Sequence, residues 1–337
     1  MKAVAYQKSL PISEANSLLD VSLPDPRPAS RDLLVKVKAV SVNPVDTKIR
    51  MRAEPAEGEY KVLGWDATGI VESVGDACSL FKPGDEVWYA GAIDRPGTNS
   101  ELHLVDERIV GKKPSTLDFA QAAALPLTSI TAWEILFDRL GILPSKRNTG
   151  QSLLIMGAAG GVGSILTQLA SCLTGLTVIG TASRPETTQW VKSLGADYVI
   201  DHHKPLLEQL NQTGINNITH VASLTKSDLH LDSLVELIAP FGKIAMIDDP
   251  GQLDFTKLKT KSISLHWELM FTRSLFATPD MIEQHRLLNE MSELVDAGLI
   301  KTTFREHYGT INAENLKRAH ALIESGQSLG KIVLEGF

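Results

Sequence analysis

The sequence predicts an α/β protein with one β-rich, turn-rich domain and one domain built on a doubly wound parallel sheet. Three observations carry this prediction. The chain has 337 residues, more than one ordinary hydrophobic core accommodates. Its first part holds short β-like runs broken by Pro and Gly, whereas apolar runs alternate with helical segments in its middle part. Its last part again mixes helical and strand-like segments.

The β-rich domain is expected over residues 1–123 and 270–337. Its predicted strands include LLVKVKAVSV, GIVESVG and EVWYAG, and they are separated by PDPRP, KPGD and RPG. The C-terminal part adds the helical stretches PDMIEQHRLLNEMSELVDAG and AENLKRAHALIESG and the closing strand KIVLEGF. These segments are expected to rejoin the first domain, so that the domain is discontinuous.

The parallel-sheet domain is expected over residues 124–269. Apolar residues recur at spacings of three and four in AAALPLTSITAWEILFDRLGI, which predicts a helix that leads into the domain. The short apolar runs SLLIMG, TVIGTA, DYVID, ITHVAS and KIAMID follow, mostly with helical segments between them. This alternation is typical of a parallel sheet covered on both faces.

Composition and charge exclude several functions. The chain has 33 Lys and Arg against 40 Asp and Glu, a net charge of −7, with the two signs mixed along the sequence. This argues against a nucleic-acid surface and against a membrane partner. Cys78 and Cys172 form no CxxC motif and no disulfide framework, and the N-terminus lacks a cationic start followed by a long apolar run. A cytoplasmic protein is the expectation.

The strongest chemical signal is SLLIMGAAGGVGSILTQLA. A buried-type strand ends at Gly157, and Gly160, Gly161 and Gly163 open a helical segment, with Val162 between the last two. Glycines there allow a tight turn and a close approach of the backbone to a pyrophosphate, which the N–H groups of the helix start would face. A glycine-rich turn without a ligand is the alternative. The order of strand, turn, helix and second strand favours a dinucleotide.

The residues at the end of the next strand indicate which dinucleotide is bound. Ser183 and Arg184 follow that strand, where an NAD-type site would have Asp or Glu. A hydroxyl and a guanidinium both donate hydrogen bonds to a 2′-phosphate, so NADPH is the predicted cofactor. Glu186 offers an alternative, because it could pair with Arg184 on an ordinary surface.

The chain resembles the medium-chain dehydrogenase/reductase superfamily over nearly its whole length. The matching segments are SVNPVDTKIR, GWDATGIVESVG, KPGDEVW, AALPLTSITAWE, GAAGGVG, LGADYVIDH, APFGKIAMID and GKIVL, in the family's order. Within the superfamily it is similar to the zinc-free quinone oxidoreductases, near the branch often labelled zinc-type alcohol dehydrogenase-like. The resemblance implies a GroES-like catalytic domain, a Rossmann domain inserted into it, an active site in the cleft and a homodimer.

Zinc is not expected, despite that label. Zinc-dependent relatives carry Cys, His and a third ligand in the segments that read SVNPVD, GWD and LPLTS here. Asn43 is a poor zinc ligand and the indole of Trp65 cannot ligate at all, while a catalytic zinc needs three protein donors. Trp65 becomes a candidate wall of an apolar substrate pocket. Asp66 is interpreted as a structural partner of nearby backbone or of a basic side chain.

The resemblance also implies the polar residues of the catalytic site. Asn43 would face the nicotinamide or a substrate oxygen, Asp46 would organise the turn, and Lys48 replaces a tyrosine found in many quinone reductases, which leaves Lys48 or solvent as the proton donor. Each has an ordinary alternative. Asn43-Pro44 is a good turn, Asp46 could only cap a helix beginning at Thr47, and Lys48 could be a solvated side chain.

Four further cofactor contacts follow from the resemblance: Thr128 and Thr131 beside the nicotinamide, His202 near the adenosine half, and Lys331 near the cleft. Thr128 and Thr131 could instead belong only to a helix start, and His202 could be an exposed loop histidine. Lys331 could be a surface charge on an edge strand. His202 and His203 make a tempting metal pair, but adjacent strand residues point to opposite faces and no third donor is obvious.

Two functions follow from these residues. The first is an NADPH-dependent oxidoreductase that transfers hydride to a quinone or an activated enone without zinc. Oxidation of an alcohol needs a Lewis acid such as zinc, whereas these acceptors are already electrophilic and the cofactor carries the difficult chemistry. The second is an NADPH-sensing binding protein with little turnover. The cleft residues are not obviously lost, which favours the enzyme.

Overall fold

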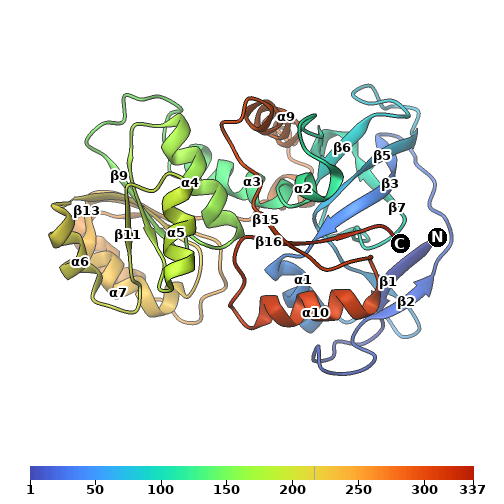
Figure 1. Cartoon of the computed structure of the whole chain (residues 1–337), viewed down its shortest axis with the longest axis horizontal. Helices are drawn as coiled ribbons and strands as arrows, with labels where there is room; N and C mark the ends of the chain where they lie inside the picture. The colour runs from blue at the N-terminus through green and yellow to red at the C-terminus, as the bar shows by residue number, and fades with distance from the viewer. Residues whose placement is uncertain (216) are drawn as a thin grey trace. The chain divides into compact units, whose positions relative to one another are not determined.

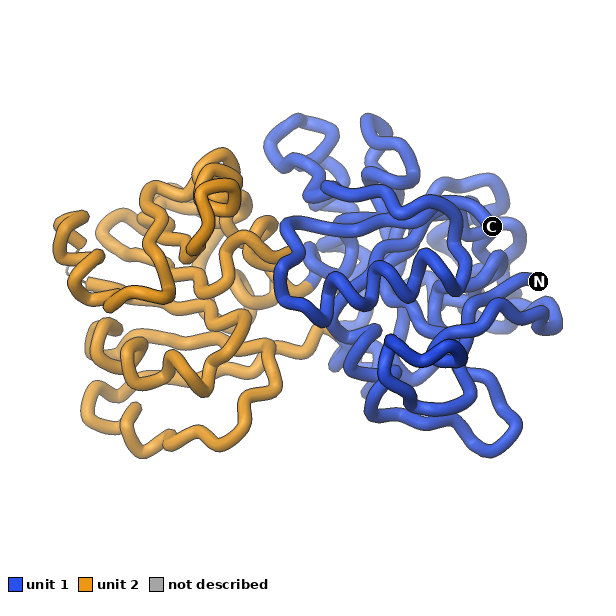
Figure 2. The backbone as a smooth tube through the Cα atoms, turned by 60° about the horizontal axis from the view of Figure 1, so that its bottom comes forward, with its two compact units in different colours: residues 1–130, 271–337 blue, residues 131–270 orange. Residues whose placement is uncertain are grey.

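The computed structural model describes residues 1–215 and 217–337 and divides the chain into two compact units, shown in Figure 2. Unit 1 comprises residues 1–130 and 271–337, and unit 2 comprises residues 131–270. The first division falls inside helix α3 (Pro126–Trp133) rather than between residues 123 and 124. One helix runs across the position where the sequence pattern changes from strand-like runs to helical spacing.

Unit 1 is built on two β-sheets. Its strands are β1 (Lys2–Tyr6), β2 (Leu19–Ser22), β3 (Asp32–Ser41), β4 (Lys61–Val62), β5 (Ala67–Val74), β6 (Glu86–Tyr89), β7 (Leu102–Asp106), β8 (Val110–Lys112), β15 (Phe304–His307) and β16 (Lys331–Glu335). One sheet has the order β2-β1-β4, and the other has the order β15-β16-β3-β5-β6-β8, with β7 paired to β3. Every pairing is antiparallel except that of β15 with β16.

The C-terminal segment rejoins the N-terminal one, as the sequence predicts. Strand β16 pairs with β3, with Val333 opposite Ser41. The helices of unit 1 are α1 (Pro44–Arg52), α2 (Phe119–Ala123), α8 (Thr272–Leu275), α9 (Glu283–Asp296) and α10 (Ala313–Glu324), with a 3₁₀ turn at Glu107–Ile109. Figure 1 shows α10 beside α1, and these two helices pack against each other.

Close backbone approach explains one glycine of the GWDATGIVESVG segment. A Cβ at Gly69 would lie 2.3 Å from the carbonyl oxygen of Lys36 on the neighbouring strand β3. Strand β5 therefore packs against β3 at a distance that only glycine allows at this position. This packing helps to fix Asp66, which lies immediately before β5.

Unit 2 has a six-stranded, wholly parallel sheet in the order β11-β10-β9-β12-β13-β14. Its strands are β9 (Ser152–Met156), β10 (Thr177–Thr181), β11 (Tyr198–Ile200), β12 (Ile218–Ser223), β13 (Ile238–Met246) and β14 (Ser264–Trp267). Its helices are α4 (Gly161–Leu173), α5 (Pro185–Ser193), α6 (Leu206–Thr213) and α7 (Ser227–Leu237), with a π-helical segment at Glu134–Arg139 and a 3₁₀ turn at Phe255–Lys261. The predicted α/β class, with a β-rich unit and a parallel-sheet unit, is confirmed.

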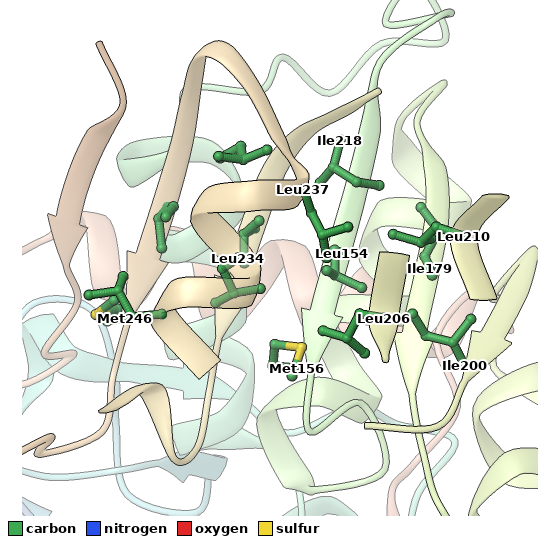
Figure 3. Close-up of a cluster of buried hydrophobic side chains, with 14 of the residues drawn as sticks. Leu154, Met156, Ile179, Ile200, Leu206, Leu210, Ile218, Leu234, Leu237 and Met246 are labelled. Carbon is green, nitrogen blue, oxygen red and sulfur yellow. The ribbon is translucent and has the colours of Figure 1, made fainter. Parts of the chain in front are cut away.

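Both faces of this sheet are covered. Figure 3 shows Leu154 and Ile179 of the sheet packed with Leu206, Leu210 and Leu234 of α6 and α7. Alternate strand residues point to the opposite face, where α4 contacts β9 and β10. Each fully buried Leu or Ile contributes about 1.5–3 kcal/mol. This core holds the carboxyl ends of the strands in place, and ligands of such sheets bind at that edge.

No helix within the described residues is both long enough and apolar enough to span a membrane.

Candidate functional site

The carboxylate of Asp66 lies at the centre of a buried polar cluster in unit 1. Its Oδ2 accepts hydrogen bonds from Ser41 Oγ at 2.9 Å, Asn43 Nδ2 at 2.8 Å and Lys331 Nζ at 3.1 Å. Its Oδ1 accepts from the backbone N–H of Leu127 at 2.7 Å. One side chain therefore joins the loop before α1, the start of β16 and the first turn of α3. The interpretation of Asp66 as a structural partner is confirmed.

Lys331 supplies the positive charge of this cluster. Its side chain is 4% exposed, and its ammonium donates to the carbonyl oxygen of Val42 at 3.0 Å, to Asn43 Oδ1 and to Asp66. These three acceptors match the three N–H groups of an ammonium. The cofactor contact expected of Lys331 stays a prediction, and the observed contacts give the residue a positioning role.

Asn43 and Asp46 define the start of helix α1. Asn43 is the N-cap, the first helical residue is Pro44, and Asp46 Oδ2 accepts from the backbone N–H of Asn43 at 2.6 Å. Proline at the first helical position favours a helix start, and so does a carboxylate that accepts a hydrogen bond from the backbone N–H of the cap residue. The helix begins at Pro44, so the alternative in which Asp46 only caps a helix beginning at Thr47 was wrong. The amide of Asn43 donates to Asp66 and accepts from Lys331.

The cluster contains two carboxylates and one ammonium, and its charges sum to 1 − 2 = −1 when all three are ionised. Burial raises the pKa of Asp46 to about 7, and the charge of Asp66 adds to that shift, while the Asn43 N–H and the Lys331 ammonium oppose it. Burial raises the pKa of Asp66 too, against the Lys331 charge and its other donors. One proton taken up by the cluster makes it neutral, and Asp46, with its pKa raised to about 7, takes up that proton as the pH falls through neutrality.

The Asp46→Asn variant tests this protonation. The folded-state pKa of Asp46 lies above its unfolded value, so its contribution to stability is complete below about pH 4 and is lost as the pH rises through about 7. We expect the melting temperature of Asp46→Asn to fall less between pH 5 and pH 8 than that of the wild type. Thermal unfolding across this range measures it, with the exposed Asp76→Asn as the matched control. Equal slopes for wild type and Asp46→Asn would contradict the shifted pKa.

Trp65 lies beside the cluster and is 1% exposed. Its indole Nε1 donates to the carbonyl oxygen of Ala92 at 3.1 Å, and its ring meets Phe271 edge-on with centroids 6.3 Å apart. These contacts hold the buried side chain in place. The role of Trp65 in a substrate pocket stays a prediction.

The remaining predicted residues of this region occupy two helices. Lys48 is half-buried on α1. Thr128 and Thr131 are buried on α3, and Thr128 Oγ1 donates to the carbonyl oxygen of Leu125 at 3.0 Å. Because Asp66 holds the adjacent Leu127 N–H, the buried cluster positions the helix turn that carries Thr128.

The glycine loop of unit 2 has the conformation that its sequence predicts. Gly157 follows β9 in the left-handed region with φ +79°, and its N–H donates to Thr181 Oγ1 at 3.0 Å. Gly160 is the N-cap of α4, and Gly161, Val162 and Gly163 form the first turn. A Cβ at Gly163 would lie 2.5 Å from the Gly157 carbonyl oxygen, whereas a Cβ at Gly160 would meet only that oxygen, at 3.5 Å. Gly163 thus serves packing, and Gly160 leaves open space.

Ser183 and Arg184 are exposed immediately after β10. Arg184 is the N-cap of α5, where its backbone N–H donates to Thr187 Oγ1 at 3.2 Å. Strands β9 and β10 are neighbours in the sheet, so these two residues lie at the same carboxyl edge as Gly157.

His202 lies beyond the end of β11 and not within the strand, so its side-chain direction relative to His203 was wrongly predicted. The two rings have centroids 4.4 Å apart, and His230 of α7 meets His202 edge-on at 6.4 Å. Burial lowers the pKa of His202, with the neighbouring His203 adding to the shift. Its Nδ1 is buried without a hydrogen-bond partner. The adenosine contact expected of His202 stays a prediction.

Sequence reasoning missed the loop after β12. A Cβ at Gly157 would lie 3.0 Å from the Thr225 methyl group, so this loop flanks the glycine loop at the point where the strand order reverses. Ser227 donates to Asp248 Oδ1 at 2.6 Å and shares a hydrogen bond with Ser223 at 2.7 Å. The signal was available, because ITHVAS is a predicted strand and ligands bind beyond strand ends.

The donor set of unit 1 does not fit a catalytic zinc. Across residues 1–215 and 217–337, no three His, Cys, Asp or Glu side chains form a group that could hold a metal ion. The oxygens of Asp66 already accept four hydrogen bonds, one of them from an ammonium, and the neighbouring Trp65 offers no lone pair to a metal. We derive no step through zinc.

Two family models match the chain. Residues 29–115 match the alcohol dehydrogenase GroES-like domain, and residues 194–334 match a family described as zinc-binding dehydrogenase. The first match lies within unit 1, so the predicted GroES-like unit is confirmed, and the second covers strands β11 to β14 of unit 2 together with most of the C-terminal part of unit 1.

Similar proteins extend over the whole chain. A zinc-type alcohol dehydrogenase-like protein of Staphylococcus epidermidis is 40% identical, with 99% of each chain covered. The crystal structure of a zinc-dependent alcohol dehydrogenase-type protein from Rhizobium etli is 57% identical, with a TM-score of 0.97 and 100% and 98% coverage of this chain and that one. Escherichia coli quinone oxidoreductase, solved with NADPH, is 25% identical, with a TM-score of 0.84 and 99% and 100% coverage.

Proposed function

This chain belongs to the zinc-type alcohol dehydrogenase-like proteins of the medium-chain dehydrogenase/reductase superfamily and is an NAD(P)H-binding oxidoreductase, and we propose that it reduces quinones or activated enones with NADPH and without catalytic zinc. In the enone reaction, bound NADPH would supply a hydride for the β-carbon, and Lys48 or solvent would supply the proton for the α-carbon, so that the products would be NADP⁺ and the saturated ketone.

One observation carries this proposal: the place expected of a metal holds a neutralised polar cluster instead. The carboxylate of Asp66 is bound by Lys331 and Asn43, with Trp65 beside it. An alcohol substrate would need its hydroxyl pKa lowered, and this cluster has no group that does so. An acceptor that is already electrophilic needs only orientation and a hydride. The NADPH complex of the similar Escherichia coli enzyme supports this choice.

The residues of the chain take distinct roles in this proposal. Gly157 to Gly163 would hold the pyrophosphate of the cofactor, while Ser183 and Arg184 would hold its 2′-phosphate. Asn43 and Asp46 fix the start of α1, and that helix presents Lys48 as the candidate proton donor. Trp65 would limit the apolar pocket, and the buried cluster would keep Thr128 in position.

The test is a single-turnover experiment in which the loss of NADPH absorbance is followed with a panel of quinones and enones. We expect oxidation by at least one quinone or conjugated enone and none by saturated ketones. Tight NADPH binding without oxidation by any acceptor would support the alternative, a cofactor-sensing binding protein. Stoichiometric zinc in the purified protein whose removal abolishes activity would overturn the zinc-free mechanism.

The Arg184→Ala variant tests the choice of nucleotide. We expect its affinity for NADPH to fall about tenfold, the loss of about 1.4 kcal/mol for one exposed charge-assisted contact, while its affinity for NADH stays unchanged. Titration of protein fluorescence with each nucleotide measures both constants. Equal weakening of the two would refute the 2′-phosphate role, and Glu186→Ala tells whether the neighbouring acid restrains the guanidinium.

Self-association is also part of the proposal. Strand β14 is an edge strand of the parallel sheet, and Trp267 and Leu269 beside that edge are about half exposed. An open edge with large apolar side chains suits pairing with a second copy of the chain. We propose a homodimer formed along β14, with no nucleic-acid or membrane partner.

A further inference from the structure

Three imidazoles and one ammonium gather at the carboxyl edge of the parallel sheet of unit 2, and we name them the His–Lys cluster: His202, His203, His230 and Lys226. The rings of His202 and His203 have centroids 4.4 Å apart, and His230 of α7 meets His202 edge-on at 6.4 Å. Lys226 is the residue before α7. The loop after β11 and the start of α7 thus bring these side chains together.

The His–Lys cluster borders the strand ends at which the dinucleotide is predicted to bind. The N–H of Ala182 donates to the carbonyl oxygen of Ile200 at 2.9 Å, so the loops after β10 and β11 leave the sheet side by side. On the other side of the glycine loop, a Cβ at Gly157 would lie 3.0 Å from the methyl group of Thr225, the residue before Lys226. The cluster therefore adjoins both the predicted pyrophosphate loop and the strand end with the predicted 2′-phosphate contacts.

The backbone of Lys226 is left-handed, with φ 50° and ψ 41°, a conformation that residues other than glycine adopt rarely and at an energetic cost. Its surroundings hold it there. Asp248 accepts from the backbone N–H of Ser227 at 2.8 Å and from the Ser227 hydroxyl at 2.6 Å, and the Lys226 carbonyl oxygen accepts from the Leu229 N–H at 3.0 Å. Because Asp248 already occupies the first N–H of α7, an anion at this edge would be bound by side chains. Backbone strain of this kind is found where it places a functional side chain.

Three carboxylates face the cluster, from its own loop, from α7 and from the loop after β13, and they are Asp201, Asp228 and Asp248. Asp201 accepts from the backbone N–H of His203 at 2.9 Å and lies 3.7 Å from Lys204 Nζ. Asp228 lies in the first turn of α7, where the helix dipole favours a carboxylate, and the third carboxylate binds the start of the same helix. Helix α6 contacts Asp201 through the uncharged amide of Gln209. Each of these carboxylates is thus stabilised by other groups, so the charge of the ammonium can act on a bound anion.

His230 is the imidazole whose charge such an anion would change. Burial lowers its pKa, and the Lys226 charge adds to that shift, so the ring is neutral in the free protein near pH 7. His202 is neutral too, and among the described residues its buried Nδ1 has no hydrogen-bond partner, so a proton there would be buried without an acceptor. An opposite charge within about 4–6 Å of an imidazole favours its protonated form. An anion beside Lys226 would therefore protonate His230.

We propose that Lys226 and His230 bind the 2′-phosphate of NADPH, and that His230 takes up a proton from solvent as this phosphate binds. The inference rests on the NADPH dependence proposed above, and it adds two residues to the contacts proposed for Ser183 and Arg184. A phosphate monoester carries a charge of about −1.5 to −2 at pH 7, which one guanidinium does not neutralise. NADH has a hydroxyl in this position and shares only the pyrophosphate, so it should bind without the proton.

The experiment is a calorimetric titration of the full chain with NADPH and with NADH, in two buffers of equal pH and different ionisation enthalpy. The difference in heat between the buffers gives the number of protons taken up on binding. The titrations run from about pH 7 to 8.5, where the phosphate is already mostly dianionic. The variants are His230→Gln, Lys226→Gln and, as the matched control, His203→Gln, which removes an exposed imidazole of the same cluster. Thermal unfolding shows that each variant is folded.

The wild type is expected to take up about half a proton per NADPH near pH 7 and none per NADH. Since the bound state holds the extra proton, the affinity for NADPH should fall about fivefold as the pH rises to 8.5, and that for NADH should stay constant. His230→Gln should abolish the uptake and this pH dependence, and Lys226→Gln should weaken NADPH about fivefold and leave NADH unchanged. His203→Gln should behave as wild type.

The outcomes separate this inference from the function on which it rests. NADPH binding without proton uptake by the wild type, uptake that persists in His230→Gln, or equal weakening of both nucleotides by Lys226→Gln would overturn the inference and leave the NADPH-dependent reductase standing. Wild-type protein that binds NADPH no more tightly than NADH would instead remove the proposed NADPH dependence, and the inference with it.

Discussion

Replacement of Lys331 by Met is expected to lower the free energy of unfolding by about 3–5 kcal/mol, because it leaves the buried carboxylate of Asp66 without its cation. The methionine fills the volume of the lysine stem, so the loss reports the charge and its hydrogen bonds rather than a cavity. Val42 and Asn43 would also lose a donor to their oxygens. Urea unfolding of the wild type and the variant measures the difference.

A double-mutant cycle separates the pair from its members. The neutral variant Asp66→Asn/Lys331→Met removes both charges, so it should be less unstable than the sum of the two single variants. Lys36→Met, at a side chain that is 56% exposed, is the matched control and should change stability by less than about 0.5 kcal/mol. A Lys331→Met variant within about 1 kcal/mol of wild type would show that the cluster does not depend on this ion pair.

The same variant separates positioning from direct cofactor binding. If Lys331 only holds Asp66 and Asn43, folded Lys331→Met should bind NADPH nearly as tightly as wild type, because the glycine loop is formed within unit 2. Its kcat should fall, since Asp66 would no longer fix the first turns of α1 and α3. A large loss of NADPH affinity under conditions where the variant is folded would instead favour the contact with the cofactor that the sequence predicts.

The glycine loop was predictable because its cause is local. Strand, turn and helix follow each other in the chain, and the need for Gly157 and Gly163 arises within seven residues of sequence. The parallel sheet was predictable for the same reason, because each βαβ unit repeats a visible pattern. Strand β14 was not predicted, since its four residues, SLHW, lack a continuous apolar run.

The buried cluster was only half predictable. The sequence showed that Trp65 excludes a zinc ligand and that Asp66 needs a partner, but Lys331 is 265 positions away from Asp66. No local pattern tells which of 33 basic residues fills that role. The contact of Glu324 with Arg50 of α1 was missed for a similar reason, because the two residues lie 274 positions apart in the chain. Tertiary packing decides such contacts.

Gly160→Ala is expected to lower the affinity for NADPH at least tenfold while the melting temperature stays within a few degrees of wild type. Gly160 has φ −72° and ψ 176°, which any residue adopts, and its added Cβ would meet only the Gly157 carbonyl oxygen at 3.5 Å. The protein itself therefore has no need of glycine here. The remaining reason is a pyrophosphate that approaches the backbone too closely for a side chain. Calorimetric titration with NADPH measures the loss.

Gly163→Ala is the contrasting variant, because the two glycines lie in the same loop and differ in what surrounds them. A Cβ at Gly163 would lie 2.5 Å from the Gly157 carbonyl oxygen and 2.6 Å from Ala158 Cα, so the backbone of the turn must shift. Stability and affinity should therefore fall together in Gly163→Ala, whereas Gly160→Ala should lose affinity alone. If Gly160→Ala bound NADPH as wild type does, the phosphate would not lie against this backbone, and the cofactor site would have to be sought elsewhere along the strand ends.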